Sequence, residues 1–191
     1  VDTIELLEQP LPAEMLKPVP TSLLFQKDIQ FRDVCFRYSG DGPLVLDNFS
    51  LVIAKGSRVG FVGSTGSGKS TTLDLLMGLL TPTEGELLVD GQLISGSQLR
   101  SWQRNIAHVP QSIYLADATL AENIAFGVPL DAIDLVRVQQ AARQAQIADF
   151  IESIPGGYQA HVGERGTRLS GGQRQRVGIA RALYRRASVL V

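Results

Sequence analysis

The chain has 191 residues, of which 44% are hydrophobic and 19% are charged, and its formal net charge is −1. This balance fits a globular domain with a hydrophobic core and excludes a largely disordered chain. The near-neutral charge gives no general attraction to nucleic acids or to anionic membranes. Cys35 is the single cysteine, which excludes an internal disulfide. No apolar run approaches the ~18 residues of a membrane span.

The first part of the chain predicts a linker followed by an antiparallel β ribbon. Residues 9–22, QPLPAEMLKPVPTS, hold four of the nine prolines, a composition typical of an extended linker. We place this linker at residues 1–27 and expect a further domain before it. Two partly alternating segments follow, IQFRDVCFRY and LVLDNFSLVIAKGS, with the turn sequence SGDGP between them. This pattern predicts two paired strands.

The rest of the chain alternates strand and helix patterns. RVGFVG, ELLVDG, NIAHVPQ and ASVLV are short apolar segments that favour strands. KSTTLDLLMGLL, residues 119–154 and residues 171–186 show the spacing of helices. Strands that alternate with helices indicate an α/β core with a parallel sheet, and the long helical stretch indicates a second lobe inserted into that core.

The glycine-rich stretch GSTGSGKS, residues 63–70, matches the pattern G-x-x-x-x-G-K-[ST] at every fixed position. It lies between a predicted strand and a predicted helix, as a phosphate-binding loop requires. Its glycines allow backbone N–H groups to point at phosphate oxygens, and the helix start adds the positive end of its dipole. Lys69 can reach the β- and γ-phosphates, and the Ser70 hydroxyl can ligate Mg²⁺. A flexible Gly/Ser linker, the alternative, does not explain the flanking strand and helix.

A second helix start offers similar chemistry. LSGGQ, residues 169–173, opens the helical segment QRQRVGIARALYRR. Ser170 is a favourable N-cap, and Gly171 and Gly172 leave backbone N–H groups uncovered. Alone, this sequence is a weak signal, because Ser-Gly-Gly before a helix is commonly an ordinary cap and turn. Together with the loop at residues 63–70, it predicts two anion-binding helix starts in one chain.

With both motifs in place, the chain resembles the nucleotide-binding domain of exporter-type ATP-binding-cassette (ABC) transporters. GSTGSGKST is similar to the family's Walker A loop, VPQ to its Q-loop, and LSGGQRQRVGIARAL to its signature motif and following helix. The similarity covers roughly residues 29–191, and the order and spacing of the motifs agree as well. The resemblance implies an ATP-binding domain over residues 28–191. Its α/β fold would be a P-loop NTPase core with a mainly parallel sheet, an N-terminal antiparallel β subdomain, and an inserted helical subdomain at about residues 112–175.

The resemblance also implies ligands and partners. In the family, ATP lies between two such domains arranged head to tail, so ATP, Mg²⁺ and a second nucleotide-binding domain are expected. A transmembrane domain would be contacted through the Gln111 region and the Glu164 loop, and no nucleic acid is expected. Lys69 and Gln111 would serve catalysis, and Ser70 and Gln111 would ligate Mg²⁺. The implied ATP-binding residues are Tyr38, Gly63, Ser64, Thr65, Gly66, Ser67, Gly68, Lys69, Ser70, Thr71, Ser170, Gly171, Gly172 and Gln173.

Two of these assignments depend on single positions. Tyr38 matches the aromatic residue that stacks on adenine in the family. An ordinary strand residue is the alternative, because Val34, Phe36 and Tyr38 share one face by alternation. VGERG, residues 162–166, resembles the X-loop of exporters, in which an acidic residue, here Glu164, contacts the membrane domain.

In the family, the strand that corresponds to ASVLV ends in Asp-Glu, which bind Mg²⁺ and polarise the attacking water. Neither these residues nor the family's switch histidine occurs by residue 191. We therefore expect a shortened part of a longer ATPase that drives export or flipping from the cytoplasmic face of the inner membrane. The 191 residues alone would be soluble and would bind ATP with little turnover. The alternatives are a soluble ABC ATPase that acts on DNA or ribosomes and a non-catalytic nucleotide switch module.

Overall fold

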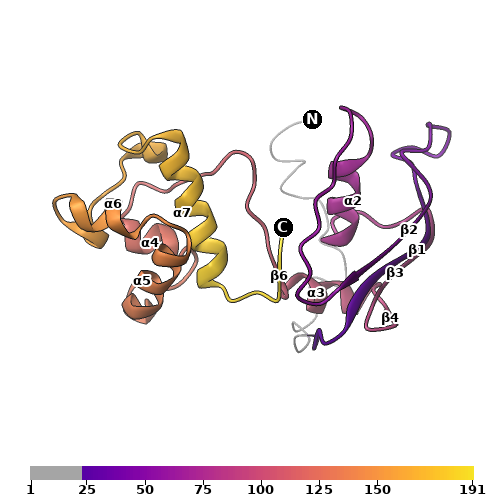
Figure 1. Ribbon diagram of the computed structural model, residues 1–191, viewed down its shortest axis with the longest axis horizontal. Coiled ribbons are helices and arrows are strands. Elements are labelled where there is room, and N and C mark those ends of the chain that lie inside the picture. Colours follow the sequence, from indigo (N-terminus) through magenta and orange to yellow (C-terminus); the bar gives the residue numbers. More distant parts are fainter. Residues whose placement is uncertain (1–22) are drawn as a thin grey trace, which may run out of the picture. The chain divides into compact units, whose positions relative to one another are not determined.

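A computed structural model describes residues 23–191 of the chain (Figure 1). The linker expected at residues 1–27 therefore lies outside the described residues, apart from its last part. The chain divides into two compact units, Val1–Asn105 and Ile106–Val191. Each unit has its own secondary structure and its own buried side chains, and each is described separately below.

The first unit contains a four-stranded antiparallel sheet in the order β2-β1-β3-β4 (Figure 1). Its strands are β1 (Asp28–Phe36), β2 (Leu46–Ala54), β3 (Glu84–Val89) and β4 (Gln92–Leu93). Among residues 23–105 its helices are α2 (Lys69–Leu76) and α3 (Ser97–Gln103). The pairing of β1 with β2 confirms the predicted antiparallel ribbon.

The helix α2 is anchored at its C-terminal end. Leu75 and Leu76 are buried, and the indole Nε1 of Trp102 in α3 donates a 2.7 Å hydrogen bond to the carbonyl of Leu76. The Trp102 ring is itself fully buried and meets Phe25 edge-on, with ring centroids 5.8 Å apart. Because close-packed aromatic side chains resist displacement, this cluster fixes the helix whose first turn follows the glycine-rich loop.

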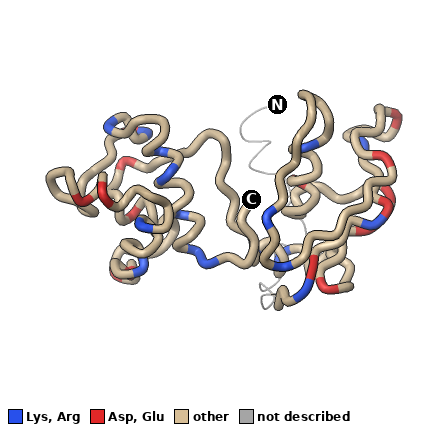
Figure 2. The backbone as a smooth tube through the Cα atoms, viewed as in Figure 1, with Lys and Arg blue, Asp and Glu red and all other residues tan. Residues whose placement is uncertain are grey.

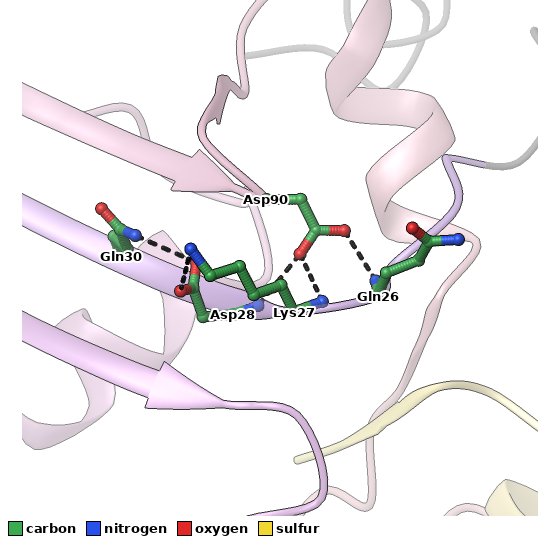
Figure 3. Close-up of polar contacts among 5 residues, drawn as sticks. All are labelled: Gln26, Lys27, Asp28, Gln30 and Asp90. Carbon is green, nitrogen blue, oxygen red and sulfur yellow. Dashed lines mark hydrogen bonds and ion pairs between the residues drawn. The ribbon is translucent and has the colours of Figure 1, made fainter.

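The segment that leads into β1 is held by one carboxylate (Figure 3). Asp90 accepts hydrogen bonds from the backbone N–H groups of Gln26 at 2.6 Å, Lys27 at 2.7 Å and Asp28 at 2.9 Å. Burial opposes ionisation of Asp90, but the three N–H donors and the charge of Lys55 outweigh it and lower the pKa of this carboxyl. The ionised form of Asp90 therefore stabilises the start of the sheet.

We expect Asp90→Asn to lower the free energy of unfolding of the chain by roughly 1–2 kcal/mol at pH 7, because the amide loses the charge-assisted hydrogen bonds. The folded-state pKa of Asp90 lies below its unfolded value, so this contribution is present above the unfolded pKa and is lost as pH falls through the folded pKa. The difference between wild type and variant should therefore shrink in acid. Denaturant titrations at neutral and acidic pH measure it.

Asp41→Asn is the matched control, because Asp41 is an exposed carboxylate in the turn between β1 and β2. Its unfolding free energy should match that of wild type at both pH values. An Asp90→Asn variant as stable as wild type at pH 7 would contradict the role given to Asp90.

The second unit is mainly helical. Its helices are α4 (Leu120–Ile124), α5 (Leu135–Gln144), α6 (Ala148–Ser153) and α7 (Gly171–Tyr184). Its single-turn 3₁₀ helices are η1 (Leu130–Ala132), η2 (Gly157–Gln159) and η3 (Glu164–Gly166), and its strands β5 (Ile106–Ala107) and β6 (Val189–Leu190) pair in parallel. The helices lie where the sequence pattern predicts them, and α7 ends two residues earlier than expected.

Side chains at helical spacing form the core of the second unit. Val138, Ala141 and Ala142 of α5 are buried with Val177 and Ala180 of α7 in one cluster. Small side chains at these positions allow the helices to approach closely. The cluster holds the N-terminal end of α7 in place, which is where the LSGGQ sequence begins.

The observed sheet differs from the predicted one. The α/β class is confirmed, but among residues 23–191 the parallel pairing is confined to β5 and β6, and the larger sheet is antiparallel. Residues 58–63, predicted as a strand, are not in a strand. A strand requires a hydrogen-bonded neighbour, and this apolar segment stays open to solvent, with Val59 48% and Val62 93% exposed.

The longest helix among residues 23–191 is α7, with 14 residues. Within the part of the chain that the structure describes, no helix combines the length and the hydrophobicity needed to cross a bilayer.

Candidate nucleotide-binding site

The glycine-rich loop of the first unit ends at the first turn of α2. Gly68 is the N-cap of α2 and has a φ of 83°, in the left-handed region that favours glycine. A Cβ atom at this position would also lie 3.0 Å from the carbonyl oxygen of Val45 and from Leu46 Cδ2. Both the backbone conformation and the close neighbours therefore require glycine here.

Lys69 folds back over this loop. Its ammonium donates hydrogen bonds to the carbonyl of Gly63 at 2.9 Å, to the carbonyl of Ser64 at 2.7 Å and to Ser67 Oγ at 3.3 Å. No acidic residue occupies the first turn of α2, so nothing in that turn neutralises the positive end of the helix. The loop, the helix end and the ammonium thus present donors and positive charge at one place, as an anion site requires.

The three hydroxyl residues in the first turn of α2 differ in their exposure to solvent. Ser70 is exposed, whereas Thr71 and Thr72 are buried. Thr72 Oγ1 donates a 2.9 Å hydrogen bond to the carbonyl of Gly68, which ties the helix to its cap. The Ser70 hydroxyl remains open to solvent, and its metal-ligand role stays a prediction.

Tyr38 lies next to this helix start. Its hydroxyl is 3.0 Å from Thr71 Oγ1, and its ring meets Phe36 edge-on at a centroid distance of 5.0 Å. Tyr38 lies two residues after the end of β1 and is 67% exposed, whereas Val34 and Phe36 are buried. The exposed ring beside the phosphate-type loop favours the adenine role over that of an ordinary strand residue, although the stacking itself stays a prediction.

The Ser170 end of α7 has the same chemistry in the second unit. Ser170 and Gln173 form a capping box, in which the Ser170 N–H donates to Gln173 Oε1 at 2.8 Å and the Gln173 N–H donates to Ser170 Oγ at 3.3 Å. Gly171 and Gly172 are exposed, and a Cβ atom on Gly172 would meet nothing within 4 Å. The first turn of α7 has no acidic residue. Its amides and dipole are therefore open to an anion.

The chain around Gln111 is tied to the same helix. Gln111 is exposed in the segment between β5 and α4. The residues after it contact α7, because Arg181 Nη1 donates to the Tyr114 carbonyl at 3.0 Å. Ile113 approaches Gly178 so closely that a Cβ atom there would lie 2.5 Å from Ile113 Cδ1. This segment is therefore closely packed against α7.

No sequence motif points to a role for Arg181, one of seven arginines between residues 165 and 191. These arginines lie on α7 and on the turns at either end of it (Figure 2). Arg181 also donates from Nε to the Asn123 carbonyl at 2.9 Å and stacks on the ring of Phe126 at 4.5 Å. Burial lowers the pKa of this guanidinium. The partners of Arg181 lie about 60 residues earlier in the sequence. The one local signal for its structural role is therefore its position in α7, four residues after the buried Val177.

The structure brings part of the predicted site together. Tyr38 and the loop at residues 63–71 lie side by side in the first unit, and the Lys69 contacts involve the loop itself. Gln111, Glu164 and residues 170–173 belong to the second unit. Glu164 is exposed at the start of η3, so its predicted contact is sterically open. The roles of all these residues in binding, metal ligation and catalysis stay predictions.

The fold and these two helix starts define a P-loop nucleotide-binding protein. A family model identifies the family within this class. The model described as ABC transporter matches residues 46–191. The chain belongs to this family.

Several named proteins are similar to the chain. It is 45% identical over 163 residues to the "ATP-dependent lipid A-core flippase" of Saccharophagus degradans, a match that covers 85% of this chain and 27% of that protein. It is 39% identical over 165 residues to the protein of the same name from Ralstonia nicotianae, covering 86% of this chain and 28% of that protein. The "Alpha-hemolysin translocation ATP-binding protein HlyB" of Escherichia coli O157:H7 is 42% identical over 166 residues, covering 87% and 23%.

A solved structure has the same fold. The chain matches "Structure of a bacterial Atm1-family ABC exporter with ATP bound" with a TM-score of 0.79 and 41% identity, over 89% of this chain and 30% of that one. The chain thus spans less than a third of the length of each of these relatives.

Proposed function

We propose that this chain is the ATP-binding domain of an exporter and that, within a longer polypeptide, it uses ATP to move a substrate across a membrane. The names of relatives support this proposal, because they include a flippase, a translocation ATP-binding protein and an ABC exporter. They do not favour a soluble ABC ATPase that acts on DNA or ribosomes. The transported substrate is not assigned, since the relatives differ in the cargo that their names state.

The observation that carries the proposal is the pair of open helix starts. The loop at residues 63–70 presents amide donors and the Lys69 ammonium, and the Ser170 end of α7 presents uncovered amides with no acidic neighbour in its first turn. A triphosphate carries enough negative charge for both. We propose that two copies face each other head to tail, so that ATP held on the loop of one copy meets the Ser170 end of the other.

The residues of the first unit suit ATP. The loop amides and Lys69 would hold the β- and γ-phosphates, and the exposed ring of Tyr38 would stack on the adenine, a contact worth about 1 kcal/mol. Without ATP, the Lys69 ammonium donates to the carbonyls of Gly63 and Ser64. On binding it would exchange these acceptors for phosphate oxygens, so its charge has hydrogen-bond partners in both states.

Magnesium also fits this donor set. Mg²⁺ retains waters and phosphate oxygens and needs only one or two protein ligands, so a carboxylate cluster is not required. The exposed hydroxyl of Ser70 would supply one ligand and the side-chain oxygen of Gln111 a second. When bound, the ion would neutralise charge on the phosphates during phosphoryl transfer.

ATP-driven self-association tests this proposal. Sedimentation velocity of the chain should show monomers without nucleotide and with ADP, and dimers with Mg²⁺-ATP, because only the γ-phosphate reaches the second helix start. Saturating ATP that binds the loop without producing dimers, in this chain and in the longer polypeptide, would contradict the proposal.

A further inference from the structure

Arg174 occupies an unfavourable place for a cation. It lies in the first turn of α7, where the positive end of the helix dipole repels a guanidinium, and no acidic residue occurs between positions 165 and 191. Its neighbours explain why it is there. Arg174 Nη1 donates a 2.7 Å hydrogen bond to the carbonyl of Leu169, the residue directly before the Ser170 cap.

The stem of Arg174 covers a second element. A Cβ atom on Gly166 would lie 3.3 Å from Arg174 Cδ, and one on Gly171 would lie 4.0 Å from its Nη2. The side chain therefore runs back from the helix, past the amides of the Ser170 end, to the turn η3, as the N-terminal tilt of helical side chains allows. Leu169 is fixed from three directions, because its N–H also donates to the Gly166 carbonyl at 3.0 Å and its side chain is buried.

We propose that Arg174 is a positioning residue for the anion-binding amides of residues 170–173. Its guanidinium fixes the Leu169 carbonyl while its stem packs on Gly166, so the Glu164–Gly166 turn and the Ser170 cap move as one body. A displacement of Glu164 would thereby change the direction in which the Gly171 and Gly172 amides point. This inference rests on the proposed function and adds to it the residue that couples the exporter-type loop to the γ-phosphate site.

Three variants test this role. Arg174→Met keeps an unbranched apolar stem but removes the charge and the donor, and Arg174→Lys restores one charged donor. Arg176→Met is the matched control, because Arg176 is exposed and donates at 3.3 Å to the carbonyl of Gln146, away from the cap.

Hydrogen exchange without nucleotide is the first readout. The N–H groups of Leu169, Ser170 and Gln173 are hydrogen-bonded around the cap, so Arg174→Met should raise their exchange rates about tenfold. Arg174→Lys should restore most of the protection, and Arg176→Met should leave it unchanged. If Arg174→Met does not fold, Arg174→Lys is measured instead. Its exchange rates at these three amides should then lie between those of wild type and those of unprotected amides.

The second readout, ATP-driven dimerisation, distinguishes a failure of the positioning role from a failure of the proposed function. ATP affinity of the loop at residues 63–70 should be the same in all variants, whereas ATP-driven dimerisation should weaken about tenfold in Arg174→Met only. Unchanged exchange at the cap amides of Arg174→Met overturns the positioning role, even if dimerisation weakens, because the guanidinium would then act on phosphate directly. Raised exchange in Arg174→Met supports the positioning role in any case. If ATP does not dimerise the wild type, either as this chain or as the longer polypeptide, the proposed function is contradicted while the positioning role stands.

Discussion

Lys69→Ala should lower the affinity of the chain for ATP at least tenfold. The ammonium of Lys69 lies within hydrogen-bonding distance of two carbonyls and one hydroxyl of the glycine-rich loop, so a phosphate bound to the loop amides would meet it directly. A hydrogen bond between charged groups contributes about 1.5–3 kcal/mol, and its loss corresponds to roughly a tenfold to hundredfold weaker complex. Titration with a fluorescent ATP analogue measures the change.

Lys27→Ala is the control for a general loss of positive charge. The Lys27 side chain is 80% exposed, and its ammonium lies 3.8 Å from Asp28, in the same unit as the loop. The Lys27 ammonium is open to solvent and pairs with Asp28 rather than with the loop, so ATP affinity should not change. Equal affinities of Lys69→Ala and wild type would show that the loop does not bind the phosphates.

Gly172→Asp should abolish ATP-driven dimerisation without harming the fold. A carboxylate near a helix N-terminus is favourable by about 0.3–1 kcal/mol, and nothing lies within 4 Å of the position where a Cβ atom would stand. Helix α7 should therefore be at least as stable as in wild type. The same carboxylate would place negative charge where the proposal puts the γ-phosphate, and it would repel that group. Sedimentation velocity with Mg²⁺-ATP, together with thermal unfolding, measures both effects.

The control is Gly172→Ala, which adds a methyl group into open space and replaces glycine by a better helix former. It should fold at least as stably as wild type and should dimerise with ATP nearly as well. Gly172→Asp that dimerises like Gly172→Ala would place the γ-phosphate elsewhere.

Local signals made much of this fold predictable. The helices α5 and α7 follow from apolar residues at helical spacing, and the starts of α4 and α7 follow from capping boxes whose partners are three residues apart. The phosphate-type loop follows from a short motif for the same reason, since its donors are its own backbone and the adjacent Lys69. Each of these features depends on residues within about one turn of one another.

Contacts between distant residues were not predictable in this way. Asp90 binds amides more than 60 residues earlier in the chain, and Arg181 binds carbonyls of residues 114 and 123. Residues 58–63 have the composition of a buried strand, yet a strand also depends on a partner that no local pattern supplies. The role of Arg174 is hidden for another reason, because its carbonyl acceptor carries no side-chain signature.

An ATP-bound structure of the longer polypeptide tests the head-to-tail arrangement most directly. The decisive quantity is the distance from the γ-phosphate held by the Lys69 loop of one copy to the Ser170 cap of the other. We predict that the Ser170 hydroxyl and the Gly171 and Gly172 amides lie within hydrogen-bonding distance of that phosphate, about 3 Å. A complex in which ATP occupies the loop while the Ser170 end of α7 faces solvent would contradict the account.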